Sequence, residues 1–344
     1  MCFMNQSDVI DCGRRLGKLR LSQFSEVTRK YGLGRCRSAV PIEAGNFRQN
    51  VSLVTDAGEW IFRGRSHYTW QFPKERFFAN LLGRETVAPV PLPYFVDESF
   101  QTFEYDYILM PKMPGLQLSD RARFAALSPL EQRSIALELG RFLHDLQAYK
   151  HPTFGYYDEE VDGLVSYERT YSEEVVSRAR ACVHRANAVT KTLSSEEVEI
   201  LFGENEHLSK IDSAQSVCVM EDYKDDNMCV TKTHKGWKVT GLFDLMGARF
   251  GHPLEDLPRQ YAVYLDTQRP ECAAAFLAGY GLSEEDRPLF NLFMLIDRLI
   301  IWEFGVREGK WWSEEETFSD WTNKYSLTEL PSFCQGTRCT SYSE

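Results

Sequence analysis

The sequence lacks the features that mark membrane, secreted and zinc-ribbon proteins. No stretch approaches the ~18 consecutive apolar residues of a membrane-spanning helix, so no membrane segment is predicted. Residues 1–21 contain no continuous apolar core and no A-x-A-like cleavage site, so we expect no secretory signal. The nine cysteines form no C-x-x-C pair, which excludes a zinc ribbon and a thioredoxin-type redox motif.

The chain has fewer basic than acidic residues, and the acidic excess is unevenly distributed. A net charge of −11 argues against non-specific binding of nucleic acids, which requires a basic surface. Residues 1–110 carry 14 Lys and Arg against 12 Asp and Glu, whereas the rest of the chain carries 25 against 38. An acidic region attracts cationic ligands, although ordinary solubility explains the same composition. The odd number of scattered thiols is typical of a reducing compartment, so we expect a cytoplasmic protein.

The length of 344 residues suits about two domains, and the sequence pattern changes near residue 112. Short β-type runs and one helical segment precede this point, and mainly helical patterns follow it. We therefore predict a helical segment at 1–38, a small β-rich lobe at 39–112 and a larger, mainly helical lobe at 113–330. The Ser/Thr-rich end, 331–344, is expected to be a poorly ordered tail.

Several elements are predicted from local signals. The runs 39–55 and 58–66 flank Asp56-Ala57-Gly58, which is a hairpin signal. Residues 73–84 predict a helix, and 105–113 predict a buried strand that runs into a turn. Capping boxes that start at Ser128 and Ser194 each predict the beginning of a helix. A β-rich island at 216–245 and a long helical stretch at 283–309 complete the second lobe.

The β-rich island carries the residues that point to chemistry. Asp222 follows one apolar strand, Asn227 lies five residues later, and Asp244 ends the next apolar run. One carboxylate that orients a hydroxyl, with an amide and a second carboxylate that hold Mg²⁺, is the set that phosphoryl transfer requires. Taken singly, three such residues are more often caps of turns.

The surrounding sequence favours the chemical interpretation. M-E-D222-Y-K-D-D-N227, followed by V-T-G-L-F-D244-L-M-G-A-R-F-G251-H-P253-L-E-D256-L, resembles the aminoglycoside phosphotransferase family of small-molecule kinases. That family reads H-G-D-x-x-x-x-N, then a strand that ends in Asp, then G-D-P-x-x-D-L. The resemblance implies an α+β fold of the bilobal, protein-kinase-like type, with a small β-rich N-lobe and a larger, mainly helical C-lobe.

The resemblance also implies roles for individual residues. Asp222 corresponds to the catalytic-loop Asp beside the acceptor hydroxyl, and Asn227 and Asp244 to the ligands of Mg²⁺. Asp256 corresponds to a buried acceptor that supports the catalytic loop. In the N-lobe, the residues implied to contact ATP or GTP are Gly45 and Asn50 in the phosphate-covering loop, Arg63 with its partner Glu75, and the hinge residues Met110 and Met113.

Three positions depart from the family pattern. Met220 stands in place of the catalytic-loop His, Glu221 in place of the following Gly, and His252 in place of the Asp in G-D-P. The expected function is Mg²⁺-dependent transfer of a γ-phosphate to a hydroxyl of a small cationic molecule such as an aminoglycoside. Two alternatives stay open: a metabolic kinase for a choline-, homoserine- or sugar-like substrate, and a pseudokinase without turnover. Acidic residues in 157–162, 255–266, 297–308 and 314–316 are candidate contacts for a cationic acceptor.

Overall fold

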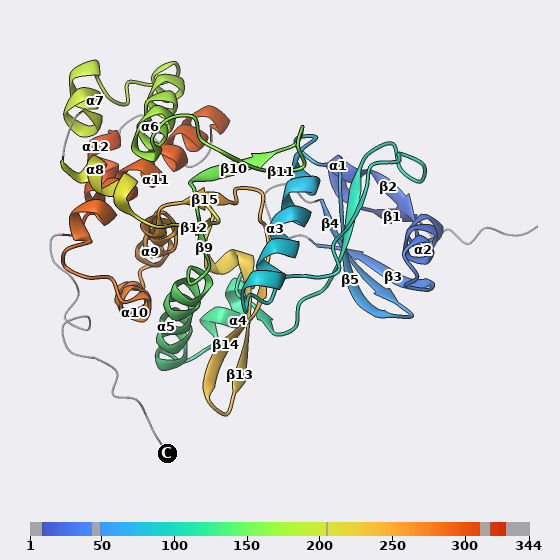
Figure 1. Ribbon diagram of the computed structural model, residues 1–344. Coiled ribbons are helices and arrows are strands. Elements are labelled where there is room, and N and C mark those ends of the chain that lie inside the picture. The colour runs from blue at the N-terminus through green and yellow to red at the C-terminus, as the bar shows by residue number, and fades with distance from the viewer. Residues whose placement is uncertain (1–8, 43–48, 204–205, 310–316, 328–344) are drawn as a thin grey trace, which may run out of the picture.

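The computed structural model describes residues 9–42, 49–203, 206–309 and 317–327 (Figure 1). Gly45, the tail at 331–344 and the acidic residues at 314–316 lie outside the described residues. Within the described part of the chain, no helix is both long and apolar enough to cross a membrane.

The N-terminal sheet is antiparallel and has five strands in the order β3-β4-β5-β7-β6. A turn at Asp56 and Ala57 joins β4 to β5, as the hairpin signal predicts. The run expected to be one strand before this turn contains two strands, one that ends at Pro41 and one that begins at Asn50. The elements are β3 (Cys36–Pro41), β4 (Asn50–Thr55), β5 (Gly58–Gly64), α3 (Gln71–Glu85), β6 (Phe95–Asp97) and β7 (Tyr107–Pro111).

The segment before residue 39 contains strands as well as the expected helices. Its elements are β1 (Val9–Asp11), α1 (Gly13–Leu16), β2 (Lys18–Arg20) and α2 (Leu21–Lys30), and β1 pairs with β2. Phe24 and Val27 of α2 are fully buried in one cluster with Val51, Leu53 and Phe62 of the sheet. Helix α2 therefore covers the face of the N-terminal sheet and shares its core.

The C-terminal part is mainly helical and contains two small sheets. The five-stranded sheet has the order β11-β10-β15-β12-β9, and a three-stranded sheet has the order β14-β13-β8. Their strands are β8 (Leu116–Gln117), β9 (Lys150–His151), β10 (Gly155–Asp158), β11 (Gly163–Ser166), β12 (Ser216–Val219), β13 (Met228–Thr233), β14 (Gly236–Leu242) and β15 (Arg249–Gly251). The predicted site residues Asp222 and Asp244 follow β12 and β14, so these short sheets position them.

Two helices of this part begin at the predicted capping boxes, and a third lies within a predicted helical stretch. Ser128 with Glu131 caps α5, Ser194 with Glu197 caps α7, and the stretch expected at 283–309 forms α11. Figure 1 shows these helices on one side of the molecule, the N-terminal sheet on the other, and α3 between them. The helices are α4 (Arg121–Ala125), α5 (Pro129–Leu146), α6 (Tyr171–Asn187), α7 (Ser195–Phe202), α8 (Glu206–Ser213), α9 (Leu257–Asp266), α10 (Pro270–Tyr280), α11 (Arg287–Glu308) and α12 (Phe318–Asn323), with 3₁₀ turns η2 (Asp225–Asn227) and η3 (Pro253–Asp256).

The larger core cluster joins the two parts of the chain. It contains Phe72 and Phe78 of α3 together with Leu139 of α5 and Phe250 of β15. Burial of these side chains removes a large apolar area from water, which favours one fixed arrangement of α3 against the C-terminal part. That arrangement brings β5 and α3 close to the loops after β12 and β14.

Candidate active site

The loop after β12 is held by a buried carboxylate. Asp256 is fully buried and accepts hydrogen bonds from the backbone N–H groups of Met220 (2.7 Å) and Glu221 (2.9 Å). Burial raises the pKa of Asp256 to about 7, although the two N–H donors and Arg249 act in the opposite direction. Asp256 therefore fixes the loop through its backbone, at the position where the sequence predicts a supporting acceptor.

Asp222 lies in this loop with both carboxylate oxygens occupied. Oδ1 accepts from Arg259 at 2.5 Å, and Oδ2 accepts from Lys224 at 2.6 Å and from the Asn227 side chain at 3.3 Å. Burial would raise the pKa of Asp222, but Arg259 and Lys224 outweigh it and lower the pKa. The side chain is 31% exposed. It is an ionised carboxylate of fixed orientation with access to solvent.

Asn227 and Asp244 present oxygen atoms beside Asp222. The Asn227 amide nitrogen donates to the Asp222 carbonyl at 2.9 Å, which leaves the Asn227 Oδ1 as an acceptor. The Phe243 N–H donates to the Asn227 carbonyl at 3.1 Å and so brings Asp244 next to Asn227. Asp244 has a φ of 66° and a side chain that is 36% exposed. A non-glycine residue in the left-handed region is uncommon and often marks a functional site.

Arg63 and Glu75 form a buried pair between β5 and α3. Arg63 donates to both carboxylate oxygens of Glu75 at 3.1 and 3.3 Å, and Gln71 and Tyr94 donate to the same carboxylate at 2.9 and 2.7 Å. Burial of the guanidinium lowers the pKa of Arg63, but the negative charges of Glu75 and Asp244 raise it by more. The pKa of Arg63 therefore lies above its usual range. Glu75 therefore keeps a charged Arg63 in one position.

The pair reaches the second lobe through Asp244. The Arg63 guanidinium lies 3.7 Å from Oδ1 of Asp244. Asn50 is directly opposite Arg63 in the β4–β5 register, so the two side chains share one face of the sheet. The Arg63 Nε and the Asn50 Oδ1 are buried without a hydrogen-bond partner. Unpaired buried polar atoms are costly, so the Arg63 Nε–H fits an acceptor such as a phosphate oxygen, whereas the Asn50 Oδ1 fits a hydrogen-bond donor.

The residues predicted to form a hinge connect the lobes. Met110 of β7 pairs with Ile61 of β5. On the other side of β7, the pairing with β6 ends at Leu109, which lies opposite Phe95. Residues after Leu109 thus have no strand partner on that side within the described part of the chain. Met113 packs closely against Gly241 of β14. A Cβ atom added at Gly241 would lie only 2.6 Å from the Met113 Cβ, so there is no room for a side chain there.

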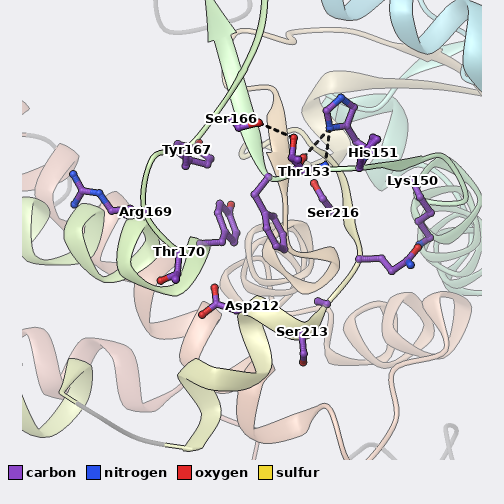
Figure 2. Close-up of a pocket in the computed structure, with 15 residues that line it drawn as sticks. Lys150, His151, Thr153, Ser166, Tyr167, Arg169, Thr170, Asp212, Ser213 and Ser216 are labelled. Atoms are coloured by element: carbon purple, nitrogen blue, oxygen red, sulfur yellow. Dashed lines mark hydrogen bonds between the residues drawn. The ribbon is translucent and has the colours of Figure 1, made fainter.

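Two cavities lie in the C-terminal part. The larger, about 670 Å³, is lined by residues of β9, the β10–β11 hairpin, the start of α6 and the segment that joins α8 to β12 (Figure 2). This cavity is lined by Ser216 at the start of β12, whereas Asp222 follows the end of that strand. No predicted site residue lines the cavity, so it is separate from the predicted site. The smaller, about 260 Å³, is lined in part by Glu221, Asp297 and Glu255. Glu221 directly precedes Asp222, and Asp297 is linked to Asp222 through Arg259.

The sequence interpretation missed two residues that contact Asp222. Arg259 joins Asp222 to Asp297, whose Oδ1 accepts from the Arg259 Nε at 2.8 Å. Lys224 lies two residues after Asp222 in the predicted loop. The position of Lys224 in the loop motif was a usable signal, whereas the contact between α9 and α11 that places Arg259 was not visible in the sequence.

Two of the acidic residues expected as candidate substrate contacts form ion pairs with arginines. Glu255 accepts from Arg249 at 2.5 Å, and Asp297 pairs with Arg259 and Arg298.

Comparisons with known proteins agree with the geometry. A family model described as the phosphotransferase enzyme family matches residues 38–291. The curated proteins contain no match to the chain. Among solved structures, the GDP complex of aminoglycoside 2'-phosphotransferase-IIIa has 16% identity and a TM-score of 0.59, over 85% of this chain and 93% of that chain.

Two further structures are similar. A thermostable mutant of aminoglycoside phosphotransferase APH(4)-Ia, in a ternary complex with ADP and hygromycin B, has 16% identity and a TM-score of 0.59, over 83% of this chain and 91% of that chain. A putative aminoglycoside phosphotransferase from Ralstonia eutropha JMP134 has 16% identity and a TM-score of 0.56, over 89% and 94% of the two chains. The predicted bilobal, kinase-like α+β fold is confirmed.

Proposed function

The chain belongs to the phosphotransferase enzyme family, and on this premise we propose that it transfers the γ-phosphate of ATP or GTP to a hydroxyl of a small molecule with the help of Mg²⁺. The observation that carries the proposal is the grouping of Asp222, Asn227 and Asp244 within reach of Arg63. Similar structures hold GDP or ADP, which supports a nucleotide as co-substrate.

Asn227 and Asp244 are suited to hold Mg²⁺. The free Asn227 Oδ1 and the half-exposed Asp244 carboxylate are hard oxygen donors, and Mg²⁺ takes few protein ligands beside phosphate and water. When bound, Mg²⁺ neutralises charge on the phosphates. Arg63, held by Glu75, supplies a second positive charge, and the unpaired Arg63 Nε is free to donate to a phosphate oxygen.

Asp222 orients the acceptor in this proposal. The alcohol oxygen forms the new bond to the γ-phosphorus, and the bond from that phosphorus to the bridging oxygen breaks. The nucleoside diphosphate leaves, and the hydroxyl proton passes to the Asp222 carboxylate and then to solvent. Because Arg259 and Lys224 lower the pKa of Asp222, it is a weak base, and positioning of the hydroxyl is its main contribution.

The nature of the acceptor has two candidates. A cationic, aminoglycoside-like acceptor is supported by neighbours whose structures contain kanamycin, gentamicin or hygromycin B, and by the net charge of −11. Such an activity would protect bacteria against the drug. A metabolic acceptor is favoured by a different observation, the three arginines in the cavity beside Asp222.

A cytoplasmic location is also proposed, since the six described cysteines are all free and buried.

A coupled assay of ADP or GDP release tests the proposal. The protein is given Mg²⁺, ATP or GTP, and a panel of aminoglycosides and metabolic alcohols. Phosphoryl transfer is supported if an acceptor stimulates nucleotide release. This stimulation should be lost in Asp222→Asn and kept in Asp145→Asn, a control at an exposed position. Nucleotide binding without release across the panel would favour the pseudokinase alternative, which Met220 and the glycine-poor phosphate-covering loop suggest.

A further inference from the structure

The cavity beside Asp222 has a defined place in the fold. Helix α6 forms one wall and α11 the other, and the loop after β12 closes one side with Glu221. Asp297 of α11 lines the cavity and is joined to Asp222 through Arg259, with contacts of 2.8 and 2.5 Å. Asp222 does not itself line the cavity, and Arg259 lies between its carboxylate and Asp297 on the wall, so a molecule in the cavity is separated from Asp222 by one guanidinium.

The cavity is small and partly apolar. Its volume is about 260 Å³, below the range of roughly 300–1,000 Å³ for pockets that take drug-sized ligands. The apolar part of the wall consists of Ala181, Phe293, Ile296 and Ile300. These dimensions suit an acceptor much smaller than a multi-ring aminoglycoside.

The charges on the wall are balanced rather than acidic. Arg178, Arg185 and Arg249 face Glu221, Glu255 and Asp297. The carboxylates are already engaged: Arg249 contacts Glu221 at 3.0 Å and Glu255 at 2.5 Å, and Arg259 holds Asp297. A polycationic acceptor would have to displace these pairs, because no carboxylate on the wall lacks a cation.

Arg178 differs from the other arginines of the wall. Its contacts with Glu174, Glu221, Glu255 and the Tyr171 hydroxyl are all between 3.4 and 3.9 Å, and its Nε is buried without a hydrogen-bond partner. Arg249 and Arg185 each have a carboxylate within 3.1 Å. The Arg178 side chain is 28% exposed. Its ion pairs, at 3.4 Å or more, are therefore longer than the shortest ion pairs of Arg249 and Arg185.

We propose that this cavity binds the acceptor and that Arg178 recognises an oxyanion on it, a carboxylate or a phosphate. A guanidinium binds either group through two parallel hydrogen bonds, which fixes orientation as well as charge. The oxyanion would hold the molecule against α6 while its hydroxyl lies at Asp222. This inference rests on the proposed phosphoryl transfer and specifies its substrate class as small alcohols that carry an acidic group.

Matched acceptors test the inference in the nucleotide-release assay. The probes are glycerate against glycerol, gluconate against sorbitol, and homoserine against its amide, with glycerol 3-phosphate to separate phosphate from carboxylate and kanamycin as the cationic probe. The expected result is at least one acid that is preferred tenfold or more over its partner without the acidic group. Stimulation only by kanamycin or uncharged alcohols overturns the inference but leaves phosphoryl transfer intact. No stimulation by any probe, with the Mg²⁺–nucleotide bound, overturns both.

Variants of α6 provide the second arm. Arg178→Met should raise KM for the acid about tenfold to a hundredfold, the value of a charge-assisted hydrogen bond, and leave kcat nearly unchanged. Arg178→Met should not alter KM for the partner acceptor that lacks the acidic group. A merely structural role of Arg178 would affect KM for both acceptors alike. Arg178→Lys should recover part of the affinity. Arg180→Met is the matched control, since Arg180 pairs with Glu199 and does not line the cavity. Equal loss for charged and uncharged acceptors would overturn the role of Arg178.

Discussion

His252 should make the stability of the protein depend on pH in the mildly acidic range. The side chain is 5% exposed, packs 5.0 Å from the Phe293 ring, and caps η3 by accepting the Leu254 N–H at Nδ1 (3.2 Å). Burial lowers its pKa from 6.5 to about 4, and Glu255 only partly offsets this. Protonation at Nδ1 would also remove the acceptor for the Leu254 N–H.

The sign and size of the effect follow from these pKa values. Between pH 6.5 and pH 4 the unfolded chain binds a proton at His252 and the folded chain does not, so stability falls as pH falls. A pKa of about 4 against 6.5 corresponds to about 3 kcal/mol lost by pH 4. The raised pKa of Asp256 has the opposite effect, because it makes stability rise as pH falls. Asp256 is present in every variant compared, so its contribution cancels when the pH dependence of two variants is subtracted.

Urea unfolding at several pH values measures this contribution. His252→Asn keeps a side-chain cap but has no titrating group, so its unfolding free energy should lose about 3 kcal/mol less than that of the parent between pH 7 and pH 4. His144→Asn is the control, because His144 is exposed on α5. The reasoning is refuted if His252→Asn and the parent lose equal stability over this range.

Three further variants address the proposed site. Asp222→Asn should reduce turnover by orders of magnitude and leave nucleotide affinity nearly unchanged; equal activity of variant and parent would remove Asp222 from the mechanism. Asp244→Ala should abolish Mg²⁺-dependent nucleotide binding, measured by titration calorimetry with and without the metal, and unaltered metal dependence would contradict its assignment as a ligand. Glu75→Gln leaves Arg63 buried with only Asp244 at 3.7 Å, and should cost about 3 kcal/mol in urea unfolding, with weaker nucleotide binding; a cost below about 1 kcal/mol would show that Glu75 does not hold Arg63.

The sequence predicts those parts of the fold that depend on neighbouring residues. Capping boxes at Ser128 and Ser194 predict helix starts because Ser and Glu three residues apart satisfy each other's backbone groups. Strands β1 and β2 escape prediction since each has three residues, too few for a periodic pattern. Their pairing depends on the packing of α2 onto the distant sheet.

The same distinction applies to the site. The residues Asp222, Asn227 and Asp244 lie within one short stretch whose spacing is characteristic, so the sequence indicates them together. Arg259 and Arg178 reach Asp222 and its cavity only because α6, α9 and α11 pack together, and single arginines on helices carry no signal. The acidic composition suggested a cationic acceptor, but the carboxylates nearest the cavity are paired with arginines, which composition cannot reveal.

The three departures from the family pattern share one structural explanation. Met220 is fully buried and contributes only its backbone N–H, which Asp256 accepts, so the loop is held without a polar side chain at that position. Glu221 has a φ of 65°, a conformation that explains why glycine is usual there. A side chain in this conformation costs about 1–2 kcal/mol, and its contacts with Arg249 and the Asp256-bound N–H offset that cost. His252 in turn caps the 3₁₀ turn that ends at Asp256. The departures thus preserve the position of Asp256, and through it the loop that carries Asp222.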